Sequence, residues 1–203
     1  MALVKYNNNS ISDITAAAGI ASGGLNLITT NTISSGVSSS SFTSSIDSTY
    51  DTYVFKYVNI HLSNDSAFLQ VNFRDGSSAY DATKTTTYFR AYHGEDGSGA
   101  TLEYNTTNDK AQSTADQPLI VGLSNDNDIA GSGTMFLFSP SSTTFVKHFI
   151  SRASASASAY ARQDFVAGYC NVTAAIDGVT FKPSAGTIDS GIIKMYGLSK
   201  SWA

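Results

Sequence analysis

The pattern of hydrophobic and polar positions is clearest between residues 50 and 74, which have the sequence YDTYVFKYVNIHLSNDSAFLQVNFR. The odd-numbered positions from Ala67 to Phe73 are apolar and the even-numbered ones are mostly polar, which is typical of a strand with one buried face. The first half is apolar on both faces, as in a strand covered by the core on one side and by a neighbour on the other. We therefore predict two adjacent antiparallel strands joined at SNDS, in a sandwich that works with a partner. Lys56 and His61 are interpreted as polar residues at an edge or a subunit contact, not as a catalytic pair.

Short apolar runs of this kind recur from Phe42 onward, and turn-forming sequences such as RDGSS, GEDGSG, NDND, SPSS and PSAGT separate them. No window shows the period of a long amphipathic helix. We therefore expect an all-β fold, a jelly-roll-type antiparallel β-sandwich of about eight strands. The candidate strands are rich in β-branched and aromatic residues and lie at about 50–62, 66–74, 85–93, 117–124, 133–138, 143–152, 163–172, 176–182 and 190–197.

Residues 1–40 depart from this pattern, since they combine small residues, glycines and a serine run without a long alternating segment. The Ser-rich piece predicts a linker. We therefore expect an N-terminal arm and linker at 1–40, which packs on a neighbouring subunit, and a β-sandwich domain at 41–203. The stretch 153–161, ASASASAYA, fits an edge strand, a packed helix turn or a surface loop equally well. The predicted subunit contacts are apolar residues without an obvious place in the sandwich, namely Ile20, Leu25, Leu27, Ile28 and Trp202.

The composition narrows the setting in which such a sandwich works. A chain of 203 residues, 41% of them hydrophobic, can form one β domain with a sizeable core. Only 14% of residues are charged, against about 25% in typical proteins, so Ser, Thr, Asn and Gly must cover the surface. Such a surface suits extracellular-facing proteins and virion parts better than cytosolic enzymes.

Charge and hydropathy also predict which partners are absent. The net charge is −4 and the basic residues are scattered singly, whereas a nucleic-acid binder needs a concentrated basic stripe. The N-terminus lacks the apolar core of a signal peptide, and no stretch approaches the length of a membrane span. We expect neither a nucleic-acid nor a membrane partner.

The residues that could carry chemistry do not form a recognisable site. His61, His93 and His148 lie within or at the ends of predicted strands without the spacing of a zinc site. Asp126 and Asp128 lie in SNDNDIAGSG, whose composition resembles a calcium loop but lacks its closing glutamate and twelve-residue frame. Turn formation explains this loop more simply, and ion binding by it is left open. We expect no metal site and no cofactor.

Covalent catalysis is equally poorly supported by the sequence. Cys170 is the one cysteine and lies in the apolar run FVAGYC, which predicts a buried, inert thiol. There is no G-x-S-x-G elbow, no phosphate-cradling loop and no pair of carboxylates that the sequence brings together. We therefore expect no catalytic residues. Tyr53, Phe55 and Tyr57 fall on one strand face, where core or interface packing is the favoured interpretation over sugar binding.

Four segments carry a resemblance to a known group of proteins: FTSSIDSTYDTYVFKYVNIHLSNDSAFLQVNFRDGSSAYD, TTTYFRAYHGEDG, SPSSTTFVKHFISR and FVAGYCNVTAAIDGVTFKPSAGTIDSGIIKMYGL. They lie between residues 42 and 198 and resemble β-rich virion structural proteins of tailed phages, including cyanophages. The resemblance implies a β-sandwich in a virion and brings no catalytic residues. Residues 1–40 depart from it, because many similar proteins reach the first segment after a shorter lead.

Two functions follow as expectations. The first is a capsid decoration (cement) protein on the virion surface, made in the bacterial cytoplasm, whose homotrimers clamp neighbouring major capsid protein subunits. The alternative is a tail-fibre or receptor-binding module that recognises a host surface glycan through exposed tyrosines in segments such as TTTYFRAYHGEDG. An enzyme such as a depolymerase is a third hypothesis, and it lacks a visible carboxylate pair or triad.

Overall fold

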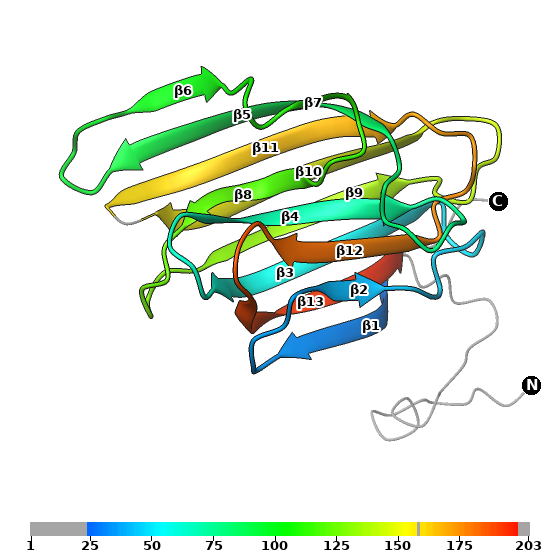
Figure 1. Ribbon diagram of the computed structural model, residues 1–203, viewed down its shortest axis with the longest axis horizontal. Helices are drawn as coiled ribbons and strands as arrows, with labels where there is room; N and C mark the ends of the chain where they lie inside the picture. The colour runs from blue at the N-terminus through cyan, green and yellow to red at the C-terminus, as the bar shows by residue number, and fades with distance from the viewer. Residues whose placement is uncertain (1–23, 158, 199–203) are drawn as a thin grey trace, which may run out of the picture.

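A computed structural model describes residues 24–157 and 159–198, which fold into two antiparallel β-sheets without a helix (Figure 1). The prediction of an all-β antiparallel sandwich is thereby confirmed. The strands are β1 (Leu25–Ile33), β2 (Ser40–Phe42), β3 (Thr52–Leu62), β4 (Ala67–Arg74), β5 (Lys84–Gly94), β6 (Thr101–Tyr104), β7 (Lys110–Ser113), β8 (Gln117–Leu123), β9 (Gly131–Phe138), β10 (Lys147–Ala157), β11 (Tyr160–Cys170), β12 (Gly178–Pro183) and β13 (Ile188–Leu198).

Eight of these strands are wound as a jelly roll. β1 pairs with β13, β2 with β12, β3 with β9 and β4 with β8, all antiparallel. The first strand thus pairs with the last, and each following pair joins strands that are closer together in the sequence. The pairs alternate between a sheet containing β1-β13-β3-β9 and a sheet of order β2-β12-β4-β8. The chain therefore crosses between sheets at each step from β1 to β4, which is the double-sheet arrangement of this fold.

The remaining strands enlarge one sheet only. β10, β11, β5 and β6 continue the first sheet beyond β9, and β7 pairs with β5, which makes nine strands in the larger sheet and four in the smaller. The outermost strands of the larger sheet therefore extend past β8, the edge strand of the smaller sheet (Figure 1). Of the stretch 153–161, which the sequence left open, residues 153–157 and 160–161 belong to β10 and β11, which pair inside the larger sheet, and Ala153 and Ala155 are buried.

Two sequence-based expectations need correction. The strands on either side of SNDS exist as expected, but β3 and β4 lie in different sheets and do not pair, because the jelly roll crosses the sandwich at this turn. Residues 25–33 and residue 40, expected in an arm and a linker, belong to β1 and to the start of β2 of the sandwich. The alternation of β1 was hidden because it is an edge strand whose register shifts between Leu27 and Thr29. Residues 1–23 lie outside the described residues.

Side-chain contacts also tie this N-terminal segment to both sheets. The Asn31 amide of β1 donates to Ser40 Oγ of β2 at 3.0 Å and to the Ser41 carbonyl at 3.3 Å. Val37, in the connection, exchanges backbone hydrogen bonds of 3.0 and 2.9 Å with Ile188. Residues 24–42 are therefore part of the folded domain and not a separate linker.

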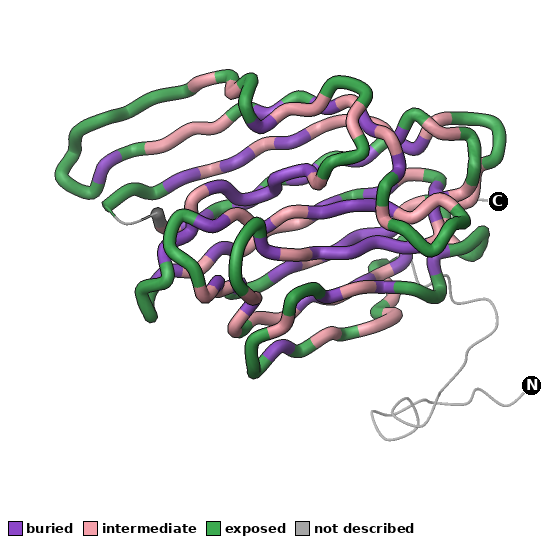
Figure 2. The backbone as a smooth tube through the Cα atoms, in the orientation of Figure 1, coloured by how far each residue is buried: buried purple, intermediate pink, exposed green. Residues whose placement is uncertain are grey.

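Aromatic side chains from both sheets fill the space between them. Phe42, Phe55 and Phe181 pack against one another with ring centroids 5.3 to 6.2 Å apart. Phe73 of the smaller sheet lies 4.9 Å from Phe149 of the larger one. All five side chains are buried, and Figure 2 shows buried positions running along the facing strands. These contacts set which face of each strand turns inward.

The predicted aromatic face of β3 belongs to this core. Tyr53, Phe55 and Tyr57 are fully buried, so their interpretation as packing residues is confirmed. The Tyr57 hydroxyl lies 2.8 Å from Ser151 Oγ, which satisfies both groups away from water.

Two buried lysines flank the cysteine at one end of the larger sheet. Lys84, Cys170 and Lys147 lie side by side in register on β5, β11 and β10. The Lys84 ammonium donates to the Ala115 carbonyl at 2.9 Å, and the Lys147 ammonium to the Val172 carbonyl at 2.8 Å. Burial lowers the pKa of Lys84 to about 8 and raises the pKa of Cys170 to about 12, although the two lysines oppose the latter shift. The expectation of a buried thiol is confirmed.

The placement of β1 in the sandwich predicts a contrast between two of its residues. Ile33 is only 7% exposed and packs in the core, whereas Leu27 is 56% exposed. We expect Ile33→Ala to lower the free energy of unfolding by about 2–4 kcal/mol through lost packing. Leu27→Ala should change it by no more than about 0.5 kcal/mol. Urea unfolding followed by circular dichroism measures both, and equal effects would contradict the placement of β1.

The buried thiol gives a second prediction. At pH 7.5 the native protein should react with a thiol reagent orders of magnitude more slowly than the urea-unfolded chain, because Cys170 is both protonated and shielded. Stopped-flow measurement of reagent absorbance gives the two rates. Comparable rates in the native and unfolded protein would show that this end of the sheet opens readily.

Candidate functional site

The larger sheet has a face that the smaller sheet does not cover, and we call it the outer face. It consists of the side chains that alternate with the buried ones along β1, β13, β3, β9, β10, β11 and β5. Strand register places these side chains in rows across the sheet, because cross-strand partners point to the same side. Its exposed large hydrophobic residues are Leu25, Leu27, Val58, Phe89, Phe136, Ile150 and Leu198.

One row across the outer face is apolar over six strands. It begins at Leu27 of the β1 edge and ends at Ala167 of β11. With neighbouring strands about 4.8 Å apart, this row is roughly 24 Å long. Its members, in order across the sheet, are Leu27, Tyr196, Val54, Phe136, Ile150 and Ala167.

The adjacent row is cationic. Lys194 of β13 is directly opposite Lys56 of β3, and Thr134 then separates Lys56 from Arg152 of β10. In residues 24–157 and 159–198, none of these three cations forms an ion pair with a carboxylate. Lys56 lies 5.8 Å from the centroid of the Tyr196 ring, which is a weak attraction for one of the charges. Like charges directly opposite each other destabilise a sheet, so this row carries a local electrostatic cost in the free chain.

The same region contains no opposing charge. The outward positions of β3, β9, β10 and β11 hold no Asp or Glu, although the whole chain has 16 acidic and 12 basic residues. A shallow depression of about 460 Å³ lies across both rows, with Val54, Phe136, Lys56 and Arg152 among its lining residues. The outer face is therefore apolar and basic on a protein that is acidic as a whole.

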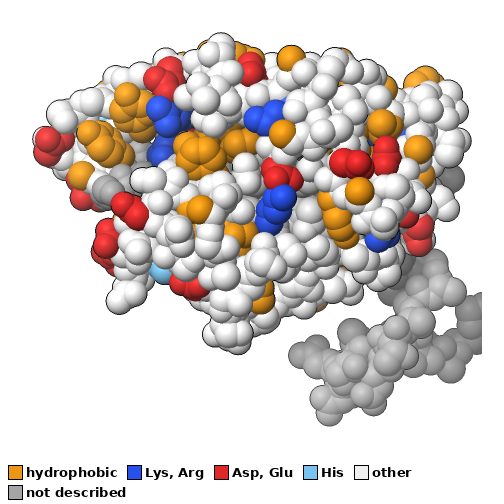
Figure 3. All heavy atoms as spheres, in the orientation of Figure 1, with side chains coloured by type: hydrophobic (Ala, Val, Ile, Leu, Met, Phe, Trp, Pro, Cys, Tyr) orange, Lys and Arg blue, Asp and Glu red, His pale blue; other side chains and the backbone are white. Residues whose placement is uncertain are grey.

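A second candidate site lies on the opposite side of the larger sheet, where β11 and β5 extend past β8. Arg90, Tyr92, Tyr160 and Arg162 line a pocket of about 250 Å³ there, which we call the Arg–Tyr pocket. Figure 3 shows basic and hydrophobic side chains side by side over this part of the molecule. Arg90 donates from Nε to Glu103 Oε1 at 2.6 Å, so this guanidinium is already paired.

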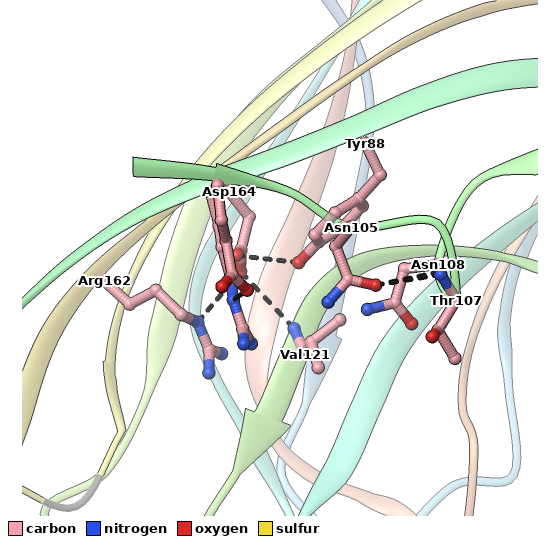
Figure 4. A network of polar contacts seen from close by, with 9 residues as sticks. Tyr88, Asn105, Thr107, Asn108, Val121, Arg162 and Asp164 are labelled. Carbon is pink, nitrogen blue, oxygen red and sulfur yellow. Dashed lines mark hydrogen bonds and ion pairs between the residues drawn. The ribbon is translucent and has the colours of Figure 1, made fainter. Parts of the chain in front are cut away.

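A buried polar network around Asp164 holds Arg162, one of the residues that line the Arg–Tyr pocket (Figure 4). The Tyr88 hydroxyl donates to Asp164 Oδ1 at 2.7 Å, while Arg162 Nε and the Val121 amide donate to Oδ2 at 3.3 and 3.4 Å. Burial raises the pKa of Asp164, although the Arg162 charge opposes the shift. Beside it, Asn105 Oδ1 accepts from the backbone amides of the following turn.

The residues that the sequence singled out as contacts fall in different places. Leu25 and Leu27 are exposed on the β1 edge of the outer face, while Ile28 is partly buried against the core at the β1 irregularity. Ile20 and Trp202 lie outside the described residues. Their role in subunit contacts stays a prediction.

The polar residues of β3 are also placed by the structure. Lys56 lies inside the larger sheet and not at an edge, because β13 and β9 flank β3. His61, at the end of β3, has Nδ1 3.7 Å from Asp189 Oδ2 and Nε2 3.2 Å from the Asp126 carbonyl. Both of these His61 contacts are with residues other than Lys56, so they do not make Lys56 and His61 a pair.

The acidic loop after β8 is a tight turn. The Ser124 hydroxyl donates to Asp126 Oδ2 at 2.7 Å, and the Ile129 amide donates to the Asp126 carbonyl at 2.9 Å. Among the described residues, no group of three or more His, Cys, Asp or Glu side chains could hold a metal ion. In the same residues, no helix is long and apolar enough to cross a membrane.

Sequence reasoning missed both the cationic row and the Arg–Tyr pocket, because each depends on strands far apart in the chain. No protein-family model matches the chain, and no curated protein matches its sequence.

The cationic row predicts an unusual effect on stability. Lys194→Gln removes the repulsion from Lys56 and keeps the contact of Lys56 with the Tyr196 ring. We expect it to raise the free energy of unfolding by about 0.5 kcal/mol at low salt, and by less at 1 M salt. Thermal unfolding at the two salt concentrations measures the change.

Lys182→Gln is the matched control for this substitution. Lys182 lies on the smaller sheet and pairs with Asp116 at 2.6 Å, so its replacement should leave stability unchanged or lower it slightly. A loss of stability in Lys194→Gln equal to that in Lys182→Gln would contradict the repulsive row.

Proposed function

We propose that the protein is a capsid decoration protein of a tailed phage, which attaches through its outer face to an acidic and apolar surface of the major capsid protein. The main observation in support of this proposal is the cationic row of Lys194, Lys56 and Arg152 beside the apolar row, with no carboxylate in either row. A partner carboxylate opposite the cationic row removes the repulsion and adds ion pairs shielded from water. The exposed members of the apolar row, Leu27, Phe136 and Ile150, supply apolar area for burial, whereas Val54 is already only 2% exposed.

The dimensions of this face suit a protein partner. The two rows cross six strands about 4.8 Å apart and lie about 6.8 Å apart along each strand, so together they cover roughly 400 Å². The mixture of Tyr196, Phe136 and Arg152 with aliphatic residues matches the composition of protein interfaces, where aromatic residues and arginine are enriched.

Charge favours a different protein over a second copy at this face. Two outer faces placed together would bring Lys56 and Lys194 of both copies into one interface, and the cationic row of neither copy contains a carboxylate. A twofold contact between two outer faces is therefore disfavoured, and the surface that the expected homotrimer uses stays a prediction. The phage setting comes from the resemblance of the segments between residues 42 and 198.

Binding to capsids tests the proposal directly. Purified protein added to heads that lack it should bind saturably and raise the temperature at which the heads release DNA. The double variant Lys56→Gln/Lys194→Gln should bind about tenfold more weakly or worse, because charge-assisted contacts at the interface are lost. Lys182→Gln removes one positive charge from the other sheet and should bind normally. Co-sedimentation and DNA-release assays measure the two effects.

The alternative role makes the opposite prediction for virions. Particles without the protein that keep their heat resistance but fail to adsorb to host cells would contradict decoration and favour a receptor-binding module. Equal binding of Lys182→Gln and the double variant would show that attachment uses another face.

A further inference from the structure

The Arg–Tyr pocket combines two kinds of surface. Arg162 of β11 is directly opposite Tyr92 of β5, and Tyr160 lies two residues before Arg162 on the same strand face. The Tyr92 and Tyr160 rings meet edge to face, with centroids 5.7 Å apart and planes at 90°. The two aromatic rings therefore line the pocket at right angles to each other, beside the guanidinium group of Arg162.

The guanidinium of Arg162 has an unused donor. Its side chain is 7% exposed, its Nε donates to Asp164, and its Nη2 is shielded from solvent without a hydrogen-bond partner. A buried donor without an acceptor costs free energy and is rare in folded proteins. Gly122 faces this group closely, since a Cβ there would lie 3.5 Å from Arg162 Nη1. Any larger residue at position 122 would narrow the space around the guanidinium.

The donor groups at the pocket favour an anionic acceptor. Its lining contains two arginines and no carboxylate. Both arginines are partly engaged, since Arg90 Nε donates to Glu103 and Arg162 Nε donates to Asp164, so the terminal guanidinium nitrogens are the donors left for a ligand. The terminal nitrogens of a guanidinium match the two oxygens of a carboxylate, and the match gives both strength and orientation.

We propose that the Arg–Tyr pocket binds an acidic saccharide through one carboxylate-bearing sugar ring. The sugar carboxylate accepts hydrogen bonds from the Arg162 guanidinium, and the apolar face of the ring packs against Tyr92 or Tyr160. The volume of about 250 Å³ lies below the roughly 300–1,000 Å³ of drug-sized ligand sites, so it admits one ring and leaves the rest of the chain outside.

This site is independent of the proposed attachment. The pocket opens on the side of the larger sheet that faces the smaller sheet, whereas the cationic row lies on the outer face. A particle-bound copy can therefore still present the pocket to a polysaccharide. Variants of Lys56 and Lys194 should leave saccharide binding unchanged, so failure of one proposal is distinguishable from failure of the other.

Titration of the full chain with carboxylated saccharides tests the proposal. The probes are trigalacturonic acid, a hyaluronan tetrasaccharide and sialyllactose, each compared with its methyl ester, and inorganic phosphate is added separately. Calorimetry or NMR chemical-shift titration should detect at least one of the three acids, and its ester should bind about tenfold more weakly or worse.

Variants identify the pocket as the place of binding. Arg162→Gln and Tyr160→Ala should each weaken binding about tenfold or more. Tyr160 is 41% exposed, so its variant keeps the fold even where the loss of Arg162 disturbs Asp164. Tyr104→Ala replaces another exposed tyrosine, on β6 and outside the pocket lining, and should bind as the native protein does.

Four outcomes would overturn the proposal. These are no binding of any of the three acids, equal binding of an acid and its ester, phosphate binding as tight as saccharide binding with the same dependence on Arg162, and binding that survives both pocket substitutions.

Discussion

The register of the larger sheet is the constraint on which both candidate binding surfaces depend. A shift of one residue in β3 would turn Lys56 into the core and Phe55 and Tyr57 toward solvent, because side chains alternate with a period of two. The aromatic contacts between the sheets exclude that shift, since the Phe55 ring lies 5.7 Å from the Phe181 ring. The packing that stabilises the sandwich therefore also decides which charges reach the surface and in which rows.

Each candidate surface carries a local cost that the rest of the structure compensates. Lys56 and Lys194 repel each other across two paired strands, and Arg162 Nη2 has no acceptor. Sequences usually avoid such conflicts, and the places where they persist are often functional. Both conflicts are relieved by the same chemistry, an external carboxylate, although the two sites lie on opposite sides of the sheet. The outer face offers a broad apolar and basic area suited to a protein, whereas the pocket is small and aromatic.

The strands added to the jelly roll create the second site. Without β5 and β11, the larger sheet would end near the edge of the smaller one and no overhang would exist. The buried lysines belong to the same addition, because the ammonium groups of Lys84 and Lys147 hold the carbonyls of the loops that follow β7 and β11. A chain with few charges thus uses two of them internally as hydrogen-bond donors.

The sequence alone determined nine of the thirteen strands and which of their faces are apolar. All nine expected strands exist, and the burial of Tyr53, Tyr57 and Cys170 followed from local patterns. Local patterns failed for β1, β2, β6 and β7, which are short, polar or irregular and are strands only through their partners. The tertiary structure alone decided the pairing of β3 with β13 instead of β4, the opposition of Lys56 and Lys194, and the meeting of Arg162 with Tyr92. These contacts join residues 70 or more positions apart, and the free energy that selects them comes from the packed core between the sheets, not from either segment by itself.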